Sequence, residues 1–323
     1  MKDNKMDRIT IQDLPGYMNS EITSYFLVQD KELRQGARDF FIRLRLGDKS
    51  GSVNGYVWTN AQELNEHFSV GDVIKLKGFI KDYKGQLQIS IINLRVAEQE
   101  EFELPDFIAT TGKDVNKMAD SLFEYINGIQ NPFLKKLLSA IFEDREFFSI
   151  FSRSPAAKNW HHNYAGGLLE HTMAVTLISD FASHQYPVNR DLLITGALLH
   201  DIGKVYEYSM KAAIDFTNIG RLVGHISIAD EIVTKKAAGI DAFPDELLMK
   251  VRHLILSHHG EYEKGAVRLP QTIEAVVLHY ADNLDAQTTG VMQLIEAVKE
   301  VSAEWTEYDK LNNRYIYLGR EED

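Results

Sequence analysis

The sequence predicts a multidomain chain in which an all-β barrel domain precedes an all-α helical bundle. Runs of β-branched and aromatic residues, separated by turn signals, fill roughly the first hundred residues. Beyond them, apolar residues recur at helical spacing almost to the end. Ten of the eleven histidines lie in this second part, between His161 and His279. The two regions should therefore have different functions.

The composition is that of a folded globular protein. A chain of 323 residues exceeds what one compact core usually holds, and 44% apolar with 25% charged residues argues against disorder. No apolar run reaches the ~18 to 20 residues of a membrane span, and the start MKDNKMDR lacks the apolar core of a signal peptide. We therefore expect a cytoplasmic location. Because cysteine is absent, any metal must be held by nitrogen and oxygen ligands.

Five β-rich runs form the first predicted domain, residues 17–97, after a short arm at residues 1–16. The runs are residues 22–29, 38–46, 52–58, 73–82 and 86–96. A short helix at residues 60–68, with Asn60 as its cap, is predicted between the third and fourth runs. Five strands with a helix at this place resemble an OB-fold, a partly open barrel that commonly binds single strands on its second and third strands.

Aromatic and basic residues alternate with the predicted core positions of the second and third strands. The whole chain carries a net charge of −12, yet residues 17–97 contain 11 basic and 9 acidic residues. Bases stack on aromatic rings, while guanidinium and ammonium groups neutralise phosphates. We therefore predict a nucleic-acid-binding surface that consists of Phe41, Arg43, Arg45, Tyr56, Trp58, Lys75 and Lys77. The alternative is a protein-contact barrel whose aromatic residues pack under a loop.

An acidic segment at residues 98–114 is the predicted linker, and the helical domain follows at residues 115–303. Its predicted helices cover residues 115–129, 133–151, 167–182, 225–238, 245–259 and 272–286, together with the apolar stretch at residues 192–204. Residues 304–323 form a polar, acidic C-terminal tail, for which the sequence predicts no role.

His200 and Asp201 interrupt the apolar stretch LLITGALLHDIGK. His200 follows Ala197 at helical spacing, so a metal-capable side chain stands where a packing residue would be expected. An imidazole beside a carboxylate can hold a divalent cation, and the second carboxylate oxygen can bridge to another. For an isolated His-Asp pair, a capped helix end with a satisfied histidine would be the simpler interpretation.

Further candidate ligands face a common interior from other helices. His171, His258 and Asp282 lie on the apolar faces of their predicted helices, and His225 opens another. The complete order is His171, His200, Asp201, His225, His258, His259 and Asp282. So many inward imidazoles, together with two carboxylates, predict a metal site.

The order H…HD…H…HH…D resembles that of the HD-domain metallohydrolases, all-helical phosphohydrolases that act on phosphate esters with one or two metal ions. The strings PAAKNWHHNYAGGLLEHT, LLHDIGK, GRLVGHI and LSHHGEYEKGA, downstream of an OB-like domain, are similar to the YhaM-type 3′→5′ exoribonucleases of Gram-positive bacteria. This resemblance covers nearly the whole chain. The GYP tripeptide of the cyclic-dinucleotide phosphodiesterases is missing, because Gly260, Glu261 and Tyr262 follow the paired histidines. A cyclic dinucleotide substrate is therefore not expected.

The resemblance implies two divalent ions, with manganese as the expected metal. It implies that His171, His200, Asp201 and Asp282 hold the first ion, and that Asp201 bridges to a second ion held by His225, His258 and His259. Nitrogen-rich ligation is also compatible with iron, cobalt or zinc. The predicted catalytic residues are Asp201, Lys204, His161 and His162. Lys204 would reach a phosphate oxygen, or be an ordinary charge at a helix end. His161 or His162 would protonate the leaving oxygen or orient the nucleotide, or serve the loop structurally.

We therefore expect a metal-dependent phosphodiesterase, a 3′→5′ exonuclease that degrades single-stranded RNA to nucleoside 5′-monophosphates, with single-stranded DNA as a second candidate substrate. Two alternatives stay open. One is an HD phosphohydrolase of small or cyclic nucleotides with the barrel as a regulatory module. The other is a single-strand-binding replication accessory protein with an inactive HD domain, although the complete ligand set counts against it. No membrane partner is expected, and a homo-oligomer is compatible with the sequence.

Overall fold

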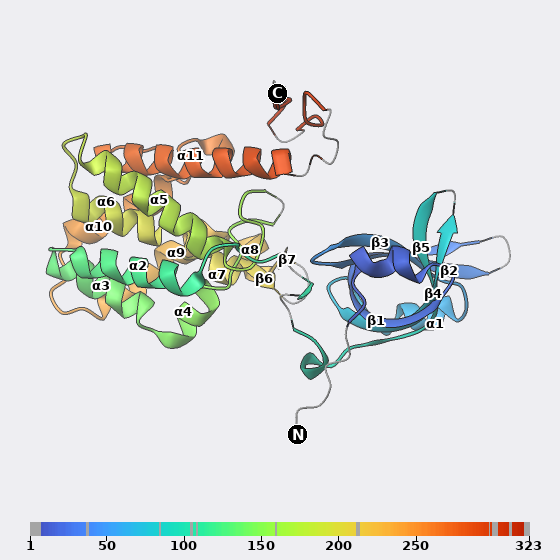
Figure 1. Cartoon of the computed structure of the whole chain (residues 1–323). Coiled ribbons are helices and arrows are strands. Elements are labelled where there is room, and N and C mark those ends of the chain that lie inside the picture. Colours follow the sequence, from blue (N-terminus) through green and yellow to red (C-terminus); the bar gives the residue numbers. More distant parts are fainter. Residues whose placement is uncertain are drawn as a thin grey trace. The chain divides into compact units, whose positions relative to one another are not determined.

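The computed structural model describes residues 8–36, 39–83, 85–103, 106–107, 109–158, 160–210, 214–296, 298, 303–309 and 312–319. The chain divides into two compact units, residues 1–110 with 209–215 and residues 111–208 with 216–323 (Figure 1). The first seven residues of the predicted arm, and residue 38 at the start of the second predicted strand, lie outside the described ranges. Within the part of the chain that the structure describes, none of the helices combines the length and apolar character that a membrane span requires.

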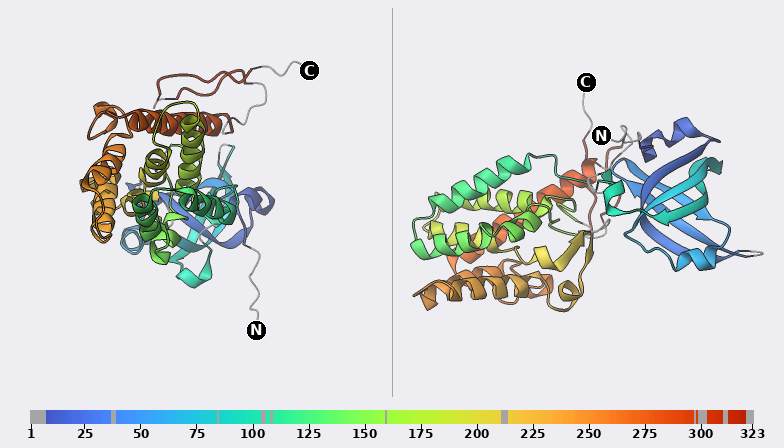
Figure 2. Two further views of the ribbon diagram at one scale, coloured as in Figure 1. Left: turned by 90° about the vertical axis from the view of Figure 1, so that its left-hand side faces the viewer. Right: turned by 90° about the horizontal axis from the view of Figure 1, so that it is seen from below.

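The first unit is a closed five-stranded barrel, which confirms the predicted fold class (Figures 1 and 2). Its strands are β1 (Glu21–Gln35), β2 (Phe40–Asp48), β3 (Gly51–Val57), β4 (Val73–Tyr83) and β5 (Gln86–Val96). They follow the order β1-β2-β3-β5-β4, in which β3 and β5 are parallel and the other pairs antiparallel. β1 runs six residues beyond its predicted end, because the second half of the strand pairs with β2.

The period-two pattern places the apolar residues of each strand inside the barrel. Ile42, Leu44 and Leu46 of β2 are fully buried, and Val53 of β3 joins them in the core. The 3₁₀ helix η1 (Ile11–Tyr17) adds the buried Leu14 to this core. The predicted arm therefore packs on the barrel from residue 8 onward.

The short helix between β3 and β4 is α1 (Ala61–Asn65), and Asn60 stands at its N-cap position as predicted but does not cap it through the side chain. Asn60 has a φ of 52°, and its side chain makes no capping hydrogen bond among the described residues. A capping side chain usually reaches the first helical amides from an extended backbone. The left-handed backbone of Asn60 serves the turn instead.

Part of the predicted linker belongs to the barrel. Glu101, in η2 (Gln99–Glu101), accepts hydrogen bonds of 2.6 Å from both terminal nitrogens of Arg95, and these bonds lower the pKa of the Glu101 carboxyl to about 2. Phe107 is buried beside Leu27 and Val73. The boundary between the two units falls after Thr110, near the end of the predicted linker.

The second unit is a helical bundle. Its helices are α2 (Val115–Gly128), α3 (Pro132–Phe142), α4 (Arg145–Phe151), α5 (Gly167–Ser183), α6 (Arg190–Leu199), α7 (Lys204–Glu207), α8 (Asn218–Leu222), α9 (His225–Ala238), α10 (Asp245–Ser257), η4 (Tyr262–Lys264) and α11 (Ile273–Glu296), and β6 (Tyr208–Met210) pairs with β7 (Ile214–Phe216). The chain between α7 and α8 thus forms one short hairpin, whose residues 209–215 are grouped with the first unit. The long helices lie alongside one another (Figures 1 and 2).

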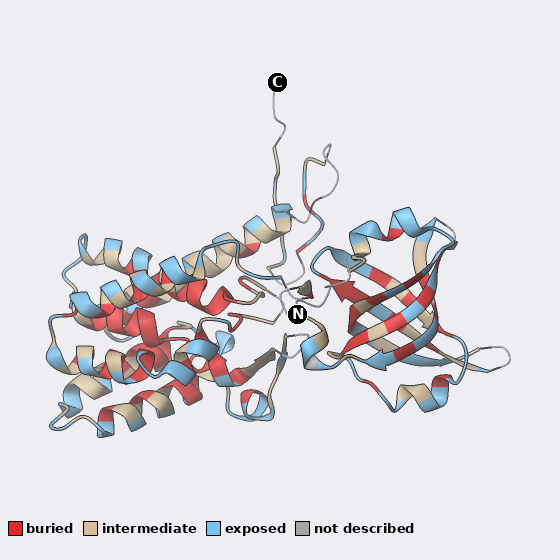
Figure 3. Ribbon diagram, turned by 60° about the horizontal axis from the view of Figure 1, so that its bottom comes forward, coloured by how far each residue is buried: buried red, intermediate tan, exposed pale blue. Residues whose placement is uncertain are grey.

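α6 is the central helix of this bundle. Every residue from Leu192 to Leu199 is buried, and α6 packs against α3, α5, α10 and α11. The buried residues accordingly follow the inner helices of the bundle (Figure 3). A helix that is apolar on all sides must be surrounded by others. The residues that end α6 are therefore held inside the bundle.

Two predicted helices of the bundle differ most from the structure. The helix predicted at residues 133–151 is two helices, because Asp144 breaks it and accepts a hydrogen bond of 3.2 Å from the amide of Phe147 as the N-cap of α4. The helix predicted at residues 272–286 continues as α11 to Glu296.

Candidate metal centre and nucleic-acid interface

The predicted metal ligands meet inside the helical unit although they come from five helices. His171 lies within α5 and Asp282 within α11, while His225 is the first residue of α9. His200 and His258 are the C-cap residues of α6 and α10, followed directly by Asp201 and His259. Helix ends thus supply most of the ligands, and the buried ends of α6 and α10 carry them into the interior.

All five imidazoles present the same nitrogen, Nε2, to the interior, because each Nδ1 is bound to a fixed acceptor. The acceptors are Asp285 Oδ2 for His171 (2.6 Å), the Ala197 carbonyl for His200 (2.8 Å), Glu207 Oε1 for His225 (3.0 Å), the Ile255 carbonyl for His258 (2.7 Å) and the Lys264 carbonyl for His259 (2.8 Å). Carbonyl and ionised carboxylate oxygens only accept hydrogen bonds, so each Nδ1 donates. In a neutral imidazole, Nε2 then carries the lone pair that a metal requires.

The Nε2 atoms form two groups, each able to hold an ion. His171 Nε2 lies 3.2 Å from His200 Nε2 and 3.2 Å from Asp282 Oδ1, which makes the first group. His225, His258 and His259 make the second group.

Asp201 lies between the two groups. Its Oδ2 is 3.4 Å from Nε2 of both His171 and His200, whereas its Oδ1 is 3.5 Å from Nε2 of His225 and 3.6 Å from Nε2 of His258. The carboxylate of Asp201 therefore faces each group with a different oxygen, which is the arrangement that a bridging ligand requires.

The residues present fit a divalent cation. Among the described residues, Asp201 Oδ1, His225 Nε2 and His258 Nε2 are buried atoms without a hydrogen-bond partner. Leaving such an atom unsatisfied costs about 1–3 kcal/mol, so three neighbouring cases call for a ligand. Imidazole nitrogen and carboxylate oxygen suit manganese, iron, cobalt or zinc.

The protonation of the ligands also favours cation binding. Burial lowers the pKa of His258, and burial lowers that of His259 to about 3, so both are neutral near pH 7. Burial by itself would raise the pKa of Asp201, but the charge of Lys204 and contacts with His200 and His171 hold it well below its usual range. Burial would lower the pKa of His171, yet hydrogen bonds to three aspartates raise it well above 6.5. That proton occupies the place that a cation would take.

The residues predicted to act on the phosphate, Lys204, His161 and His162, are largely buried. Lys204 Nζ is 2.6 Å from Asp201 Oδ2 and almost fully buried, so it neutralises the carboxylate of Asp201. Burial lowers the pKa of His161 to about 3, which leaves its imidazole uncharged near pH 7 and disfavours it as a proton donor. His162 is buried and uses both ring nitrogens, with Nδ1 2.8 Å from the Tyr164 hydroxyl and Nε2 2.9 Å from Asp285 Oδ2. It therefore lies behind His171.

Sequence reasoning missed Asp285 and Glu207, the two carboxylates that accept hydrogen bonds from the candidate ligands His171 and His225. Asp285 follows Asp282 by three residues and so shares its face of α11, which was a usable signal. Glu207 gives no such signal, because its partner His225 is 18 residues further along the chain.

The aromatic residues predicted to bind nucleic acid form one cluster on the outside of the barrel. The rings of Phe41 and Trp58 stack with centroids 5.0 Å apart, and those of Tyr56 and Trp58 with centroids 5.4 Å apart. Trp58, which follows β3 directly, is 52% exposed. Arg43 pairs with Tyr56 across β2 and β3, and Arg45 donates to Ser52 Oγ at 2.8 Å. These five residues make one continuous surface.

Lys75 and Lys77 are not part of this aromatic surface. They lie on β4, which hydrogen-bonds to β1 and β5 and not to β2 or β3. Lys77 forms an ion pair of 2.9 Å with Glu21, and Lys75 one of 3.8 Å with Glu101. The prediction grouped them with Phe41 by charge alone, and the strand order of the closed barrel separates them.

Comparison with known proteins agrees with both domains. The family model of the HD domain matches residues 168–287, and that of the OB-fold nucleic acid binding domain matches residues 27–97. The 3′-5′ exoribonuclease YhaM of Bacillus subtilis (strain 168) is 33% identical over 305 residues, which cover 93% of this chain and 95% of that protein. The proteins of the same name from Bacillus pumilus (strain SAFR-032) and Geobacillus sp. (strain WCH70) are 34% and 33% identical, over 86% of this chain and 88% and 85% of theirs. The chain therefore belongs to the YhaM family of 3′-5′ exoribonucleases.

Proposed function

We propose that this chain is a metal-dependent 3′→5′ exoribonuclease that shortens single-stranded RNA and releases nucleoside 5′-monophosphates. The observation that carries the proposal is the position of Asp201 between two histidine groups. One of its oxygens lies 3.4 Å from Nε2 atoms of the first group, and the other lies 3.5 and 3.6 Å from Nε2 atoms of the second. The direction of degradation and the RNA substrate follow the names of the relatives.

In the proposed mechanism, each ligand group would hold one divalent ion, with manganese as the expected metal. His171, His200 and Asp282 would hold the first, His225, His258 and His259 the second, and Asp201 would contact both. A divalent ion in such a site supplies Lewis acidity at the phosphate and lowers the pKa of water toward neutrality.

The protein's own groups prepare this site for a phosphodiester. Lys204 offsets the charge of Asp201 and keeps the carboxylate ionised despite its burial. His161, uncharged near pH 7, offers a neutral imidazole beside His171, with ring centroids 5.3 Å apart, and can hydrogen-bond a ribose hydroxyl or a phosphate ester oxygen. We assign His161 to orienting the nucleotide.

The barrel would hold the single strand. Base stacking on Phe41, Tyr56 and Trp58 is tolerant of sequence, since every base has an aromatic face. Arg43 and Arg45, which lie on β2 with Phe41, would contact the phosphates of the nucleic acid. A duplex hides its base faces, so this surface favours single strands.

The test is a time course on 5′-labelled single-stranded RNA, with a DNA copy alongside, first in EDTA and then in manganese. Wild type should give a manganese-dependent ladder that shortens from the 3′ end, and Asp201→Asn should lose at least about 100-fold in rate, since even outer groups of metal sites commonly contribute 10- to 100-fold. Glu274→Gln is a matched control, because this carboxylate also lies on a helix of the bundle but accepts from the amide of Asn189. Labelled RNA that is bound but never shortened would refute the nuclease assignment and direct the search to small nucleotides.

A further inference from the structure

We propose that Asp285 and Glu207 are positioning residues, each of which orients one metal-facing histidine in a different ligand group. Asp285 would fix His171 in the first group, and Glu207 would fix His225 in the second. The inference rests on the proposed metal-dependent function but concerns how the site is built.

The need for these carboxylates follows from where the histidines lie in their helices. His200 and His258 cap α6 and α10, and each Nδ1 donates to the carbonyl three residues earlier, at Ala197 and Ile255. The last four carbonyls of a helix lack intrahelical partners, so these acceptors come with the fold.

His171 and His225 have no such acceptor in their own helices. His171 lies inside α5, where the carbonyls of the preceding turn are used by the helix itself. His225 is the first residue of α9, so no helical turn precedes it. Each therefore depends on a side chain from another element, Asp285 from α11 and Glu207 from α7.

Asp285 is itself held from the side opposite the metal site. Its Oδ2 accepts from His171 Nδ1 at 2.6 Å and from His162 Nε2 at 2.9 Å. His162 Nδ1 contacts the Tyr164 hydroxyl at 2.8 Å, and that hydroxyl donates to Glu170 Oε2 at 3.0 Å. The backbone of His162 adopts a left-handed φ of 51°, a conformation that costs energy in a non-glycine residue.

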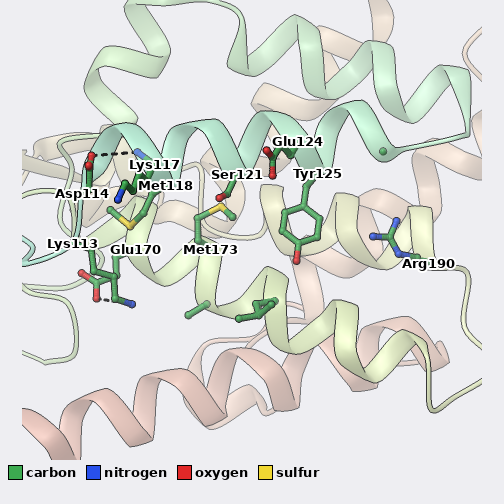
Figure 4. A pocket seen from close by; sticks show the side chains of 13 residues that line it. Lys113, Asp114, Lys117, Met118, Ser121, Glu124, Tyr125, Glu170, Met173 and Arg190 are labelled. Carbon is green, nitrogen blue, oxygen red and sulfur yellow. Dashed lines mark hydrogen bonds and ion pairs between the residues drawn. The ribbon is translucent and has the colours of Figure 1, made fainter.

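This hydrogen-bonded chain ends at the surface of the bundle. Glu170 also accepts from Thr111 Oγ1 at 2.6 Å and forms an ion pair of 3.2 Å with Lys113. Lys113 and Glu170 lie together at one end of a pocket of about 820 Å³ that α2 and α5 line (Figure 4). The carboxylate of Asp285 is thus fixed by contacts that extend from the surface to His171.

Glu207 makes a shorter connection in the second group. Its Oε1 accepts from both the backbone amide and Nδ1 of His225, each at 3.0 Å. Both bonds end on the same oxygen, so the start of α9 and the ring of His225 are fixed together. Burial would raise the pKa of Glu207, but its bonds from His225 keep it below the usual value.

The group of His162, His171 and Asp285 is close enough to suggest a third ion site, but hydrogen bonding explains it better. An ion there would have to take Nδ1 of His171, whose Nε2 already belongs to the first group. A histidine that bound through both nitrogens would have to lose its last proton. The contacts of 2.6 and 2.9 Å are those of ordinary hydrogen bonds.

The experiment measures ion binding in the full-length chain without RNA, by calorimetric titration of the metal-free protein with manganese chloride. Wild type should bind two ions in separable steps. Asp285→Asn should weaken one step and Glu207→Gln the other, each by about 10- to 100-fold, because outer groups of metal sites commonly have effects of this size. Tyr164→Phe removes one oxygen from the Asp285 chain and should weaken the Asp285 step alone, by less. Glu274→Gln should change neither step.

Several outcomes would overturn the inference. One is that Asp285→Asn or Glu207→Gln weakens both ion-binding steps equally. Another is that neither variant weakens any step. The last is that wild type binds a third ion and Asp285→Asn does not. The unfolding temperature of each metal-free variant should match that of wild type. If Tyr164→Phe and Asp285→Asn each lower it, the hydrogen bonds from Tyr164 to Asp285 have a structural role instead. In the nuclease assay, Asp285→Asn should lower kcat and leave the KM for RNA unchanged. A wild type that binds two ions but cuts no RNA would refute the proposed function while the positioning result stands.

Discussion

Replacing Gly203 with alanine should disturb both the fold and the metal centre, because this glycine lies where α9 meets the end of α6. A Cβ at Gly203 would lie 2.0 Å from the carbonyl oxygen of His225 and 2.8 Å from the amide nitrogen of Ala229. Both are backbone atoms that cannot rotate away. An ordinary contact begins near 3.4 Å, so the start of α9 must move by about 1.4 Å.

That movement would separate His225 from Asp201. The distance between His225 Nε2 and Asp201 Oδ1 is now 3.5 Å. A displacement of about 1 Å in a catalytic site can cost about 100-fold in rate. Overpacking of a core typically costs about 1–3 kcal/mol of unfolding free energy. For a domain of roughly 200 residues, each kcal/mol lowers the Tm by about 2–4 °C, so we expect a fall of about 2–12 °C.

The assays are thermal unfolding of the metal-free protein, manganese titration and RNA degradation, each compared with Gly128→Ala. Gly128 ends α2, and an added Cβ there meets none of the described atoms within 4 Å. This control should be neutral or more stable by up to about 1 kcal/mol. If Gly203→Ala unfolds at the wild-type temperature and binds both ions as wild type does, the close approach of α9 does not position His225.

Two further substitutions test the barrel and the bundle separately. Trp58→Ala should weaken binding of single-stranded RNA by about 1–3 kcal/mol, or about 5- to 150-fold, in fluorescence anisotropy at fixed salt; Tyr83→Ala, which alters an exposed aromatic residue on β4, should bind as wild type, and equal losses in both variants would contradict a specific stacking surface. Asp144→Ala should lower the unfolding free energy by about 1 kcal/mol in urea titration with an unchanged m value, because α4 loses its N-cap, whereas Asp144→Asn should keep most of the stability.

The convergence of the candidate ligands could be predicted because it depends on the spacing of residues along each helix. Helical spacing placed His171, His258 and Asp282 on apolar faces, and the structure directs all three into one interior. The same reasoning applied to strands separated the buried Ile42 from the outward Phe41. Periods of 3.6 and 2 residues follow from backbone geometry, so they can be read without the fold.

The grouping of Lys75 and Lys77 with the aromatic residues shows where local reasoning stops, because proximity in space was inferred from similarity in charge. Lys75 was grouped with Phe41 by charge, but a closed barrel places β4 away from β2 and β3. Lys75 and Lys77 pair instead with Glu101 and Glu21, neighbours that no local pattern reveals. Lys204 was expected either to reach a phosphate oxygen or to be an ordinary charge at a helix end. Its Nζ lies 2.6 Å from Asp201 Oδ2, and the phosphate contact stays a prediction.

Local patterns were enough to predict a β-barrel followed by a helical bundle, and the histidines and aspartates that face the interior of the bundle. The fold was needed to show which nitrogen each histidine presents, that the two oxygens of Asp201 face different ligand groups, and that Asp285 and Glu207 stand behind His171 and His225. This division follows from the range of the interactions. Burial patterns depend on neighbours within one or two turns, whereas the orienting hydrogen bonds of His171 and His225 span 114 and 18 residues of chain.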